Sequence, residues 1–131
     1  METREINPWT WQDGFGFAHA REVSGAARIL TLSGQCATDA NGAPQHKGDM
    51  AGQLALAVAN LGAVLTAAGM SYANVTSIRV LTTDMDATLA NWRALIGPFA
   101  AVGHRPASTL AGVTRLFSPD LLVEVEATAC A

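Results

Sequence analysis

Residues 49–69, DMAGQLALAVANLGAVLTAAG, decide how this chain folds. Their apolar side chains recur every three or four positions, which places them on one side of a helix: Leu54, Val58, Leu61, Leu65 and Ala68. Asp49 can accept a hydrogen bond from an early backbone N–H, and Gly69 stands where a left-handed C-terminal cap belongs. The stretch therefore predicts a long helix with one side packed on a core.

Strands are predicted on both sides of this helix, at 15–24, 28–34, 75–83, 107–116 and 121–129. The first two are separated by a short turn at Gly25, so an antiparallel hairpin is expected there. Residues 1–14 before it are expected to form an irregular arm. The last strand alternates apolar and polar residues, so its two faces differ: Val123, Val125 and Ala127 against Glu124, Glu126 and Thr128.

A second helix is expected from residue 86, where Asp86 can cap it. Its apolar side would be Leu89, Trp92, Ile96 and Phe99, and Pro98 should kink or shorten it because proline lacks an N–H. The order strand, strand, helix, strand, helix, strand, strand predicts one α+β domain over residues 1–131, with a single mixed sheet and both helices on one face. Only 15% of the residues are charged. We therefore expect another subunit to cover the second face.

The composition argues against several classes of partner. The net charge is −3 and the eight Lys and Arg residues are scattered, whereas nucleic-acid binding needs clustered cations. The N-terminus does not resemble a signal peptide, and the apolar stretch 54–68 is shorter than the ~20 residues of a membrane span. These features predict a cytoplasmic protein without nucleic-acid or membrane partners.

Few side chains stand out as carriers of chemistry. His19, His46 and His104 lack metal-ligand spacing, so no metal is expected, and Cys36 and Cys130 are expected to be buried thiols. Trp9 and Trp11 could stack on a ligand or pack the arm onto the fold. Glu124 and Glu126 share one face of the last strand. They are ordinary polar residues if that face meets solvent, and candidates for an acid or base if it borders a cleft.

Five short motifs, in order and spread over most of the chain, resemble those of one family. They are the strand end Leu32-Ser33-Gly34-Gln35, the helix pattern Gln53, Asn60-Leu61, Leu65 and Ala68-Gly69, the helix start from Asp86 to Asn91, the strand start Pro106-Ala107, and the closing strand Val123-Glu124-Val125-Glu126-Ala127. This pattern is similar to that of the RidA/YjgF family, which is also labelled endoribonuclease L-PSP.

The resemblance implies a chorismate mutase-like fold and a homotrimer whose sheets form a central barrel. It also implies three clefts between neighbouring subunits, each binding a small metabolite without cofactor or metal. The activity best known in the family is the hydrolysis of reactive imines and enamines. By resemblance, Glu124 would position or activate water. The residues implied to bind substrate are Phe17, Ser33, Gly34, Asn91, Ser108 and Thr109.

The chain departs from the family pattern at Ser108, where the family carries an arginine. That arginine grips the substrate carboxylate through two parallel charge-assisted bonds. Arg105 lies three residues earlier, an odd offset that on a strand points to the opposite face. Phe17 similarly stands where the family has a tyrosine. We therefore expect the usual 2-imino acid activity to be impaired.

Three functions remain open at this stage. The first is a deaminase-type hydrolase acting on another imine, enamine or related compound. The second is a metabolite-binding or chaperone-like protein without catalysis. The third is the endoribonuclease or translation inhibitor of the family's other label, which fits poorly with an acidic chain that lacks paired histidines.

Overall fold

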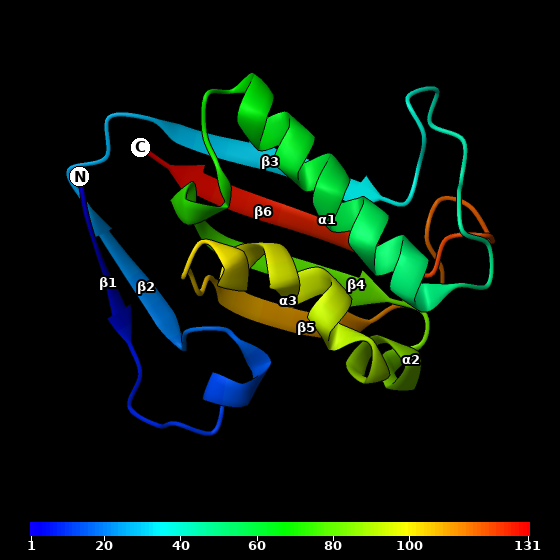
Figure 1. Ribbon diagram of the computed structural model, residues 1–131, viewed down its shortest axis with the longest axis horizontal. Helices are drawn as coiled ribbons and strands as arrows, with labels where there is room; N and C mark the ends of the chain where they lie inside the picture. The colour runs from blue at the N-terminus through cyan, green and yellow to red at the C-terminus, as the bar shows by residue number, and fades with distance from the viewer.

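The computed structural model describes all 131 residues (Figure 1). Its elements follow in the order β1 (Glu2–Ile6), η1 (Asp13–Phe15), β2 (Ala20–Ser24), β3 (Ile29–Cys36), α1 (Met50–Ala67), η2 (Tyr72–Asn74), β4 (Val75–Thr82), α2 (Met85–Ala90), α3 (Trp92–Ala101), β5 (Ala107–Gly112) and β6 (Val123–Cys130). Here η1 and η2 are single 3₁₀ turns. The chain is thus an α+β protein, as predicted.

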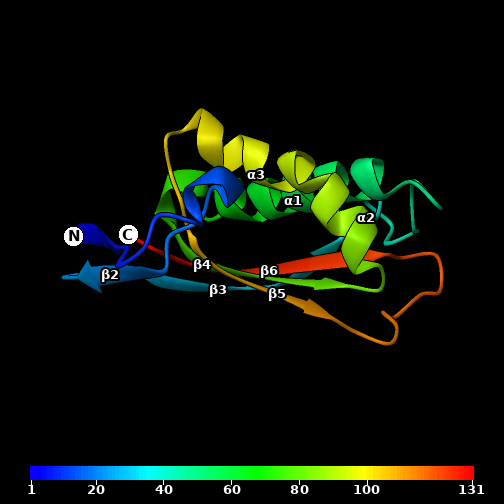
Figure 2. The same ribbon diagram turned by 90° about the horizontal axis from the view of Figure 1, so that it is seen from below.

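The main sheet has four strands in the order β3-β6-β4-β5, and only the β4–β5 pair is parallel. All three α-helices lie on one face of this sheet, and most of the other face has no cover from the chain (Figure 2). The core lies between the two layers, where its largest fully buried side chains include Phe99, Leu54, Leu61, Leu65, Leu95, Val80 and Val123. The predicted mixed sheet with helices on one face is confirmed. We call its uncovered side the open face.

Helix α1 begins and ends as the sequence predicts. The Asp49 side chain accepts a hydrogen bond from the Gly52 N–H at 3.0 Å, and Gly69 follows the helix with φ +71°. The length of α1 and its mean hydropathy of 1.5 would also suit a membrane-spanning helix. Its apolar side, however, packs on β3 and β6, and Leu54, Leu61 and Leu65 are fully buried. The helix is therefore a core helix of this domain.

Two amides on α1 explain part of the motif pattern. The buried Gln53 donates to the Asp120 carbonyl at 2.8 Å and accepts from the Leu122 N–H at 2.8 Å, which holds the loop before β6. Asn60 donates to the carbonyls of Cys36 and Thr38, at 2.9 and 3.0 Å. Both side chains satisfy backbone groups that would otherwise be orphaned. They fix the ends of β3 and β6 beside each other.

The N-terminal prediction was wrong. Residues 2–6 form β1 rather than an irregular arm, and β1 pairs with β2 in a separate two-stranded sheet. The expected hairpin between 15–24 and 28–34 does not form, because β3 pairs with β6 instead. The segment just before β3 is held by the C-terminal residue of the chain, because the N–H groups of Ala27 and Arg28 both donate to the Ala131 carbonyl at 2.8 Å. Such distant pairing overrides the local turn signal.

The second helix also differs from its prediction. Asp84, not Asp86, caps α2, because Asp84 is still extended and accepts from the Ala87 N–H at 3.0 Å. The helix breaks at Asn91 and continues as α3 through Pro98, whose missing N–H removes one bond without ending the helix. The buried Leu95 and Phe99 keep this segment on the core.

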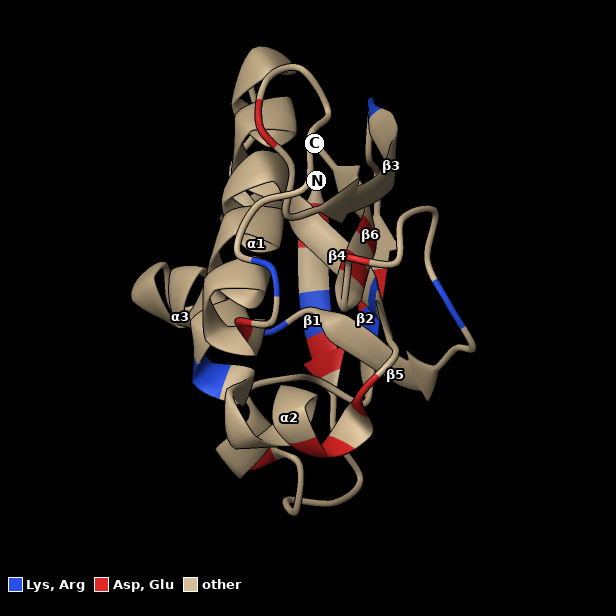
Figure 3. Ribbon diagram, turned by 90° about the vertical axis from the view of Figure 1, so that its right-hand side faces the viewer, with Lys and Arg blue, Asp and Glu red and all other residues tan.

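Ion pairs fasten the N-terminal segment to the rest of the fold. The Arg105 guanidinium pairs with Glu5 and Asp13, both at 2.6 Å, and Arg21 pairs with Glu5 at 3.0 Å. Burial raises the pKa of Glu5, but the hydrogen bond and charge of Arg105 and the charge of Arg21 outweigh burial and hold that pKa below its usual value. The remaining charges are of both signs and are spread along the ribbon (Figure 3).

Candidate functional site

The first candidate cluster lies where β3 and β6 meet on the open face. The register between the strands shifts between Leu32 and Gln35, so Ser33 and Gly34 sit in a bulge. Bulges often occur beside active sites, where they redirect a side chain. A Cβ on Gly34 would overlap the Glu124 carboxylate. Glycine therefore leaves the space that this carboxylate occupies against β3. We call Ser33, Gly34 and Glu124 the β3–β6 site.

The structure separates the two glutamates that share this face. Glu126 forms an ion pair with Arg79 on the neighbouring β4, at 3.0 Å. Glu124 is half-buried and forms no ion pair. A carboxylate that is not neutralised by a cation can still accept a proton from water. Glu124 is therefore the stronger candidate for the general base.

Cys36 lies beside Glu124 and is itself buried. Burial raises the pKa of the Cys36 thiol from 9.0 to about 12, and the charge and hydrogen bond of Glu124 add to this effect. The thiolate is the nucleophilic form of cysteine. Cys36 is therefore protonated at neutral pH and does not act as a nucleophile in this cluster.

Cys36 should accordingly resist alkylation. In a Cys130→Ser background, we expect iodoacetamide at pH 8 to react at least tenfold more slowly with Cys36 in the folded protein than in urea.

The protonated Cys36 thiol also links the stability of the fold to pH. Because the pKa is raised on folding, its contribution is complete below pH 9 and is lost as the pH rises toward 12. Cys36→Ala should lessen the fall in melting temperature across that range, and an unchanged fall would contradict the assignment.

The second candidate cluster is a cavity of about 190 Å³ at the opposite edge of the sheet, beside β5. Its lining is almost entirely apolar and comes from the N-terminal segment, α2, α3 and β5: Trp11, Phe15, Phe17, Leu89, Trp92, Ser108 and Leu110. Ser108 pairs with the core residue Ile78 across the strands, so it points to the helix side of the sheet. We call this cavity the aromatic pocket.

The two remaining predicted site residues line other hollows. Asn91 joins α2 to α3, donates to the Ala87 carbonyl at 2.9 Å, and lines a hollow that adjoins the aromatic pocket through Phe15, Leu89 and Trp92. Thr109 is exposed on the open face, in a hollow of about 230 Å³ near Arg79 and Glu126. No group of three or more His, Cys, Asp and Glu residues could hold a metal ion.

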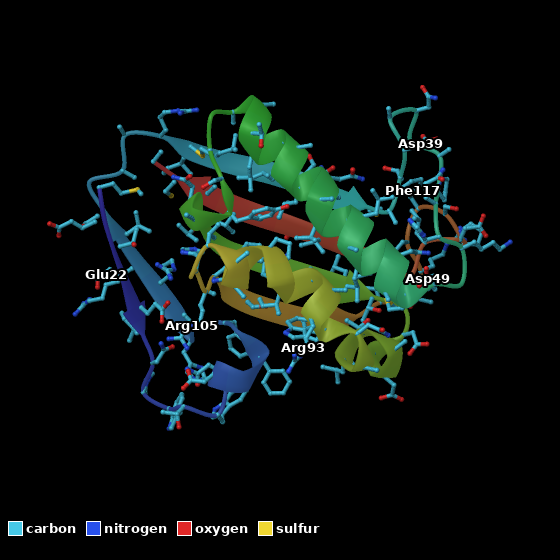
Figure 4. The ribbon with its side chains drawn as sticks, in the orientation of Figure 1. Glu22, Asp39, Asp49, Arg93, Arg105 and Phe117 are labelled. Carbon is cyan, nitrogen blue, oxygen red and sulfur yellow. The ribbon has the colours of Figure 1, made fainter.

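Arg105 does not enter the aromatic pocket. Figure 4 places its side chain among those of the N-terminal segment, near the start of β2, where Glu5 and Asp13 bind it. Arg105 also precedes β5, so the alternation of side chains along a strand, on which its predicted direction was based, does not apply to it. No cationic side chain lines the pocket at the position of Ser108.

Comparison with known proteins identifies the family. A model of the family described as endoribonuclease L-PSP matches residues 17–131. The chain belongs to this family, the RidA/YjgF family. A Rid-family protein of unknown function from Yersinia pestis has 39% sequence identity, with all of both chains covered and a TM-score of 0.90. The family resemblance of the sequence motifs is thus confirmed.

Other RidA/YjgF-like structures are more distant. A protein of unknown function from Pseudomonas aeruginosa has 28% identity over 98% of this chain and 92% of its own, with a TM-score of 0.67. The Escherichia coli YjgF gene product shares the fold at 24% identity, with 87% of each chain covered and a TM-score of 0.69. No match was found among the curated proteins.

Within one RidA/YjgF-type chain, the predicted site residues form two separate groups. Ser33, Gly34 and Glu124 lie at the β3 edge, whereas Phe17 and Ser108 lie at the β5 edge. Motif analysis overlooked Phe15, Leu89, Trp92 and Leu110 as pocket residues. The density of aromatic residues between positions 9 and 17 was the available signal, but it did not reveal that α2, α3 and β5 complete the wall.

Proposed function

We propose that the protein is a cytoplasmic homotrimer that binds a small metabolite in clefts between neighbouring chains. The open face carries half-buried side chains and little cover from its own chain, which favours packing against copies of itself. The two half-sites lie at opposite edges of the sheet. A cyclic trimer would bring the β3–β6 site of one chain next to the aromatic pocket of the next.

We further propose that the bound metabolite is an imine or enamine and that the reaction is its hydrolysis. Glu124 would accept a proton from water as the water oxygen bonds to the imine carbon, and would pass that proton to the imine nitrogen to give a carbinolamine. Transfer of the hydroxyl proton through Glu124 to the same nitrogen would then break the C–N bond and give a carbonyl compound and ammonia or an amine. The observation that carries this proposal is the Glu124 carboxylate, which lies against Gly34 and has no cation as a partner.

The substrate would differ from the 2-imino acids typical of the family. Their carboxylate needs a cation, and a charged hydrogen bond of this kind is worth about 1.5–3 kcal/mol. Ser108 carries no charge, and Arg105 is held by Glu5 and Asp13. A few kcal/mol lost in orientation corresponds to about two orders of magnitude in rate. We therefore expect slow turnover of 2-imino acids.

The function can be tested with imines formed in the assay by an amine oxidase or an amino-acid oxidase. Their decay is followed by trapping with semicarbazide, and the native mass is measured in parallel. We expect a mass near 41 kDa, three times the 13.6 kDa chain. Amine-derived imines should decay faster with the protein than without it, and 2-imino acids should decay about 100-fold more slowly than with an arginine-bearing relative.

A binding protein without catalysis is the second candidate, favoured by the pocket around Ser108, whose lining offers no cation to a substrate carboxylate. Such a protein would be stabilised by a metabolite against heat without forming product. Thermal stabilisation with no imine decay across the panel would therefore replace the hydrolase proposal. RNA cleavage that Glu124→Ala abolishes would instead favour the ribonuclease.

A further inference from the structure

The aromatic pocket differs from the rest of the surface in both shape and chemistry. Six of its seven lining residues are apolar, and four of these are aromatic: Trp11, Phe15, Phe17 and Trp92. Ser108 supplies its one hydroxyl. An apolar cavity of about 150 Å³ is large enough to bind benzene in another protein, and this pocket measures about 190 Å³. A single aromatic ring therefore fits it.

The lining of the pocket favours an uncharged occupant, because it contains no Lys, Arg, Asp or Glu. The nearby Arg105 already binds two carboxylates, from Glu5 and Asp13. Arg93 is exposed and lines the adjoining hollow rather than the pocket itself. A carboxylate placed against this lining would lose water without gaining a cation, which is costly. A ligand with an amide in place of the carboxylate, or with an unsubstituted ring, would avoid this cost of desolvation.

The N-terminal segment holds its share of the wall in place. The Trp92 indole N–H donates to the Phe15 carbonyl at 2.8 Å, which ties η1 to α3. Trp11 packs edge-to-face on Phe17, with ring centroids 5.7 Å apart. These contacts fix the rings before any ligand arrives, and such preorganisation lowers the entropy lost on binding.

Two features meet at this pocket. Ser108 places an uncharged side chain of β5 in its wall, and Trp11 and Phe15 contribute aromatic surface from the N-terminal segment. Trp11 remains 63% exposed and Leu89 45% exposed, so part of this apolar surface is still open to a ligand. Both features favour an apolar and uncharged group.

We infer that the aromatic pocket binds an uncharged aromatic ring of the ligand, and that the N-terminal segment determines this preference. The inference rests on the proposed function only for the position of the reacting bond, which would lie toward Glu124 of a neighbouring chain. The expected ligand is thus an aryl compound that has no carboxylate close to its aromatic ring.

The test compares phenylacetamide with phenylacetate, two ligands of similar shape that differ in charge. Binding to the unmodified protein is followed at pH 7 by the NMR signals of its three tryptophan indole N–H groups. Trp11 and Trp92 line the pocket, whereas Trp9 does not. We expect phenylacetamide to shift the Trp11 and Trp92 signals, to leave that of Trp9 in place, and to bind at least tenfold more tightly than phenylacetate.

Variants add a matched control. Trp9 and Trp11 are 62% and 63% exposed, so both can be truncated at similar cost to the fold. Trp11→Ala should weaken phenylacetamide binding at least tenfold, Trp9→Ala less than twofold, and Ser108→Arg should reverse the preference in favour of phenylacetate. Equal binding of the two ligands, or equal effects of the two tryptophan variants, would overturn the inference.

The result is separable from that for the proposed function. Imine hydrolysis without shifts at Trp11 and Trp92 would overturn the pocket assignment and leave the hydrolase proposal intact. Binding of the aromatic ring without hydrolysis of any imine would support the pocket assignment and overturn the hydrolase proposal.

Discussion

Glu124→Gln is expected to lower the rate of imine hydrolysis at least 100-fold while leaving the fold and the assembly unchanged. A positioned general base contributes about 10²–10⁴-fold to a reaction of this type. Glutamine keeps the size of the side chain, so the space above Gly34 stays filled, but it cannot take a proton from water. The rate is measured by semicarbazide trapping with the best amine-derived imine, alongside melting temperature and native mass.

Glu126→Gln provides the matched control. Glu126 lies two residues further along β6 on the same face, and its carboxylate is already paired with Arg79. Losing a partly exposed ion pair costs about 0–1 kcal/mol, so the hydrolysis rate should change less than threefold. If the two variants lost activity equally, or if Glu124→Gln retained full activity, Glu124 would not be the base.

Thr128→Arg is expected to convert the trimer into monomers and to abolish cleft activity. Thr128 lies on the open face between Thr31 of β3 and Ser77 of β4, and it lines the hollow on that face. An arginine here would bring three unpaired cations into the proposed interface. The desolvation of each costs several kcal/mol. Sedimentation should report a species near 13.6 kDa in place of the trimer.

Ala59→Arg serves as the control for this experiment. Ala59 is exposed on α1, on the helical layer opposite the open face. Introducing an arginine at this position should leave the mass near 41 kDa and the activity unaltered. A Thr128→Arg protein that still sediments as a trimer would refute the packing of open faces against one another.

Local patterns predicted the elements that local contacts determine. The spacing of Leu54, Leu61 and Leu65 and the cap at Asp49 fixed α1 to within a residue or two, because a helix makes its hydrogen bonds within itself. The alternation around Val123 and Val125 predicted the two faces of β6. The pairing of β1 with β2, and of β3 with β6, depends on residues far apart in the chain. No turn signal at Gly25 could have revealed it.

The site was predictable only in part, for a related reason. Period-two alternation places Glu124 and Glu126 on one face but cannot distinguish them. The cross-strand neighbour Arg79 makes that distinction, and it is known only once β4 is placed beside β6. The aromatic pocket draws on the N-terminal segment, α2, α3 and β5, so no single stretch of sequence carries its pattern.

The fastening of the N-terminal segment has a practical consequence for anyone who shortens this protein. A chain cut at residue 17, where the family match begins, would lose Glu5 and Asp13 together with β1. Arg21, whose side chain is only 7% exposed, would then lack its carboxylate partner and keep only its hydrogen bonds to the Arg105 carbonyl. The start of the family match is therefore not a boundary at which this domain can safely be trimmed.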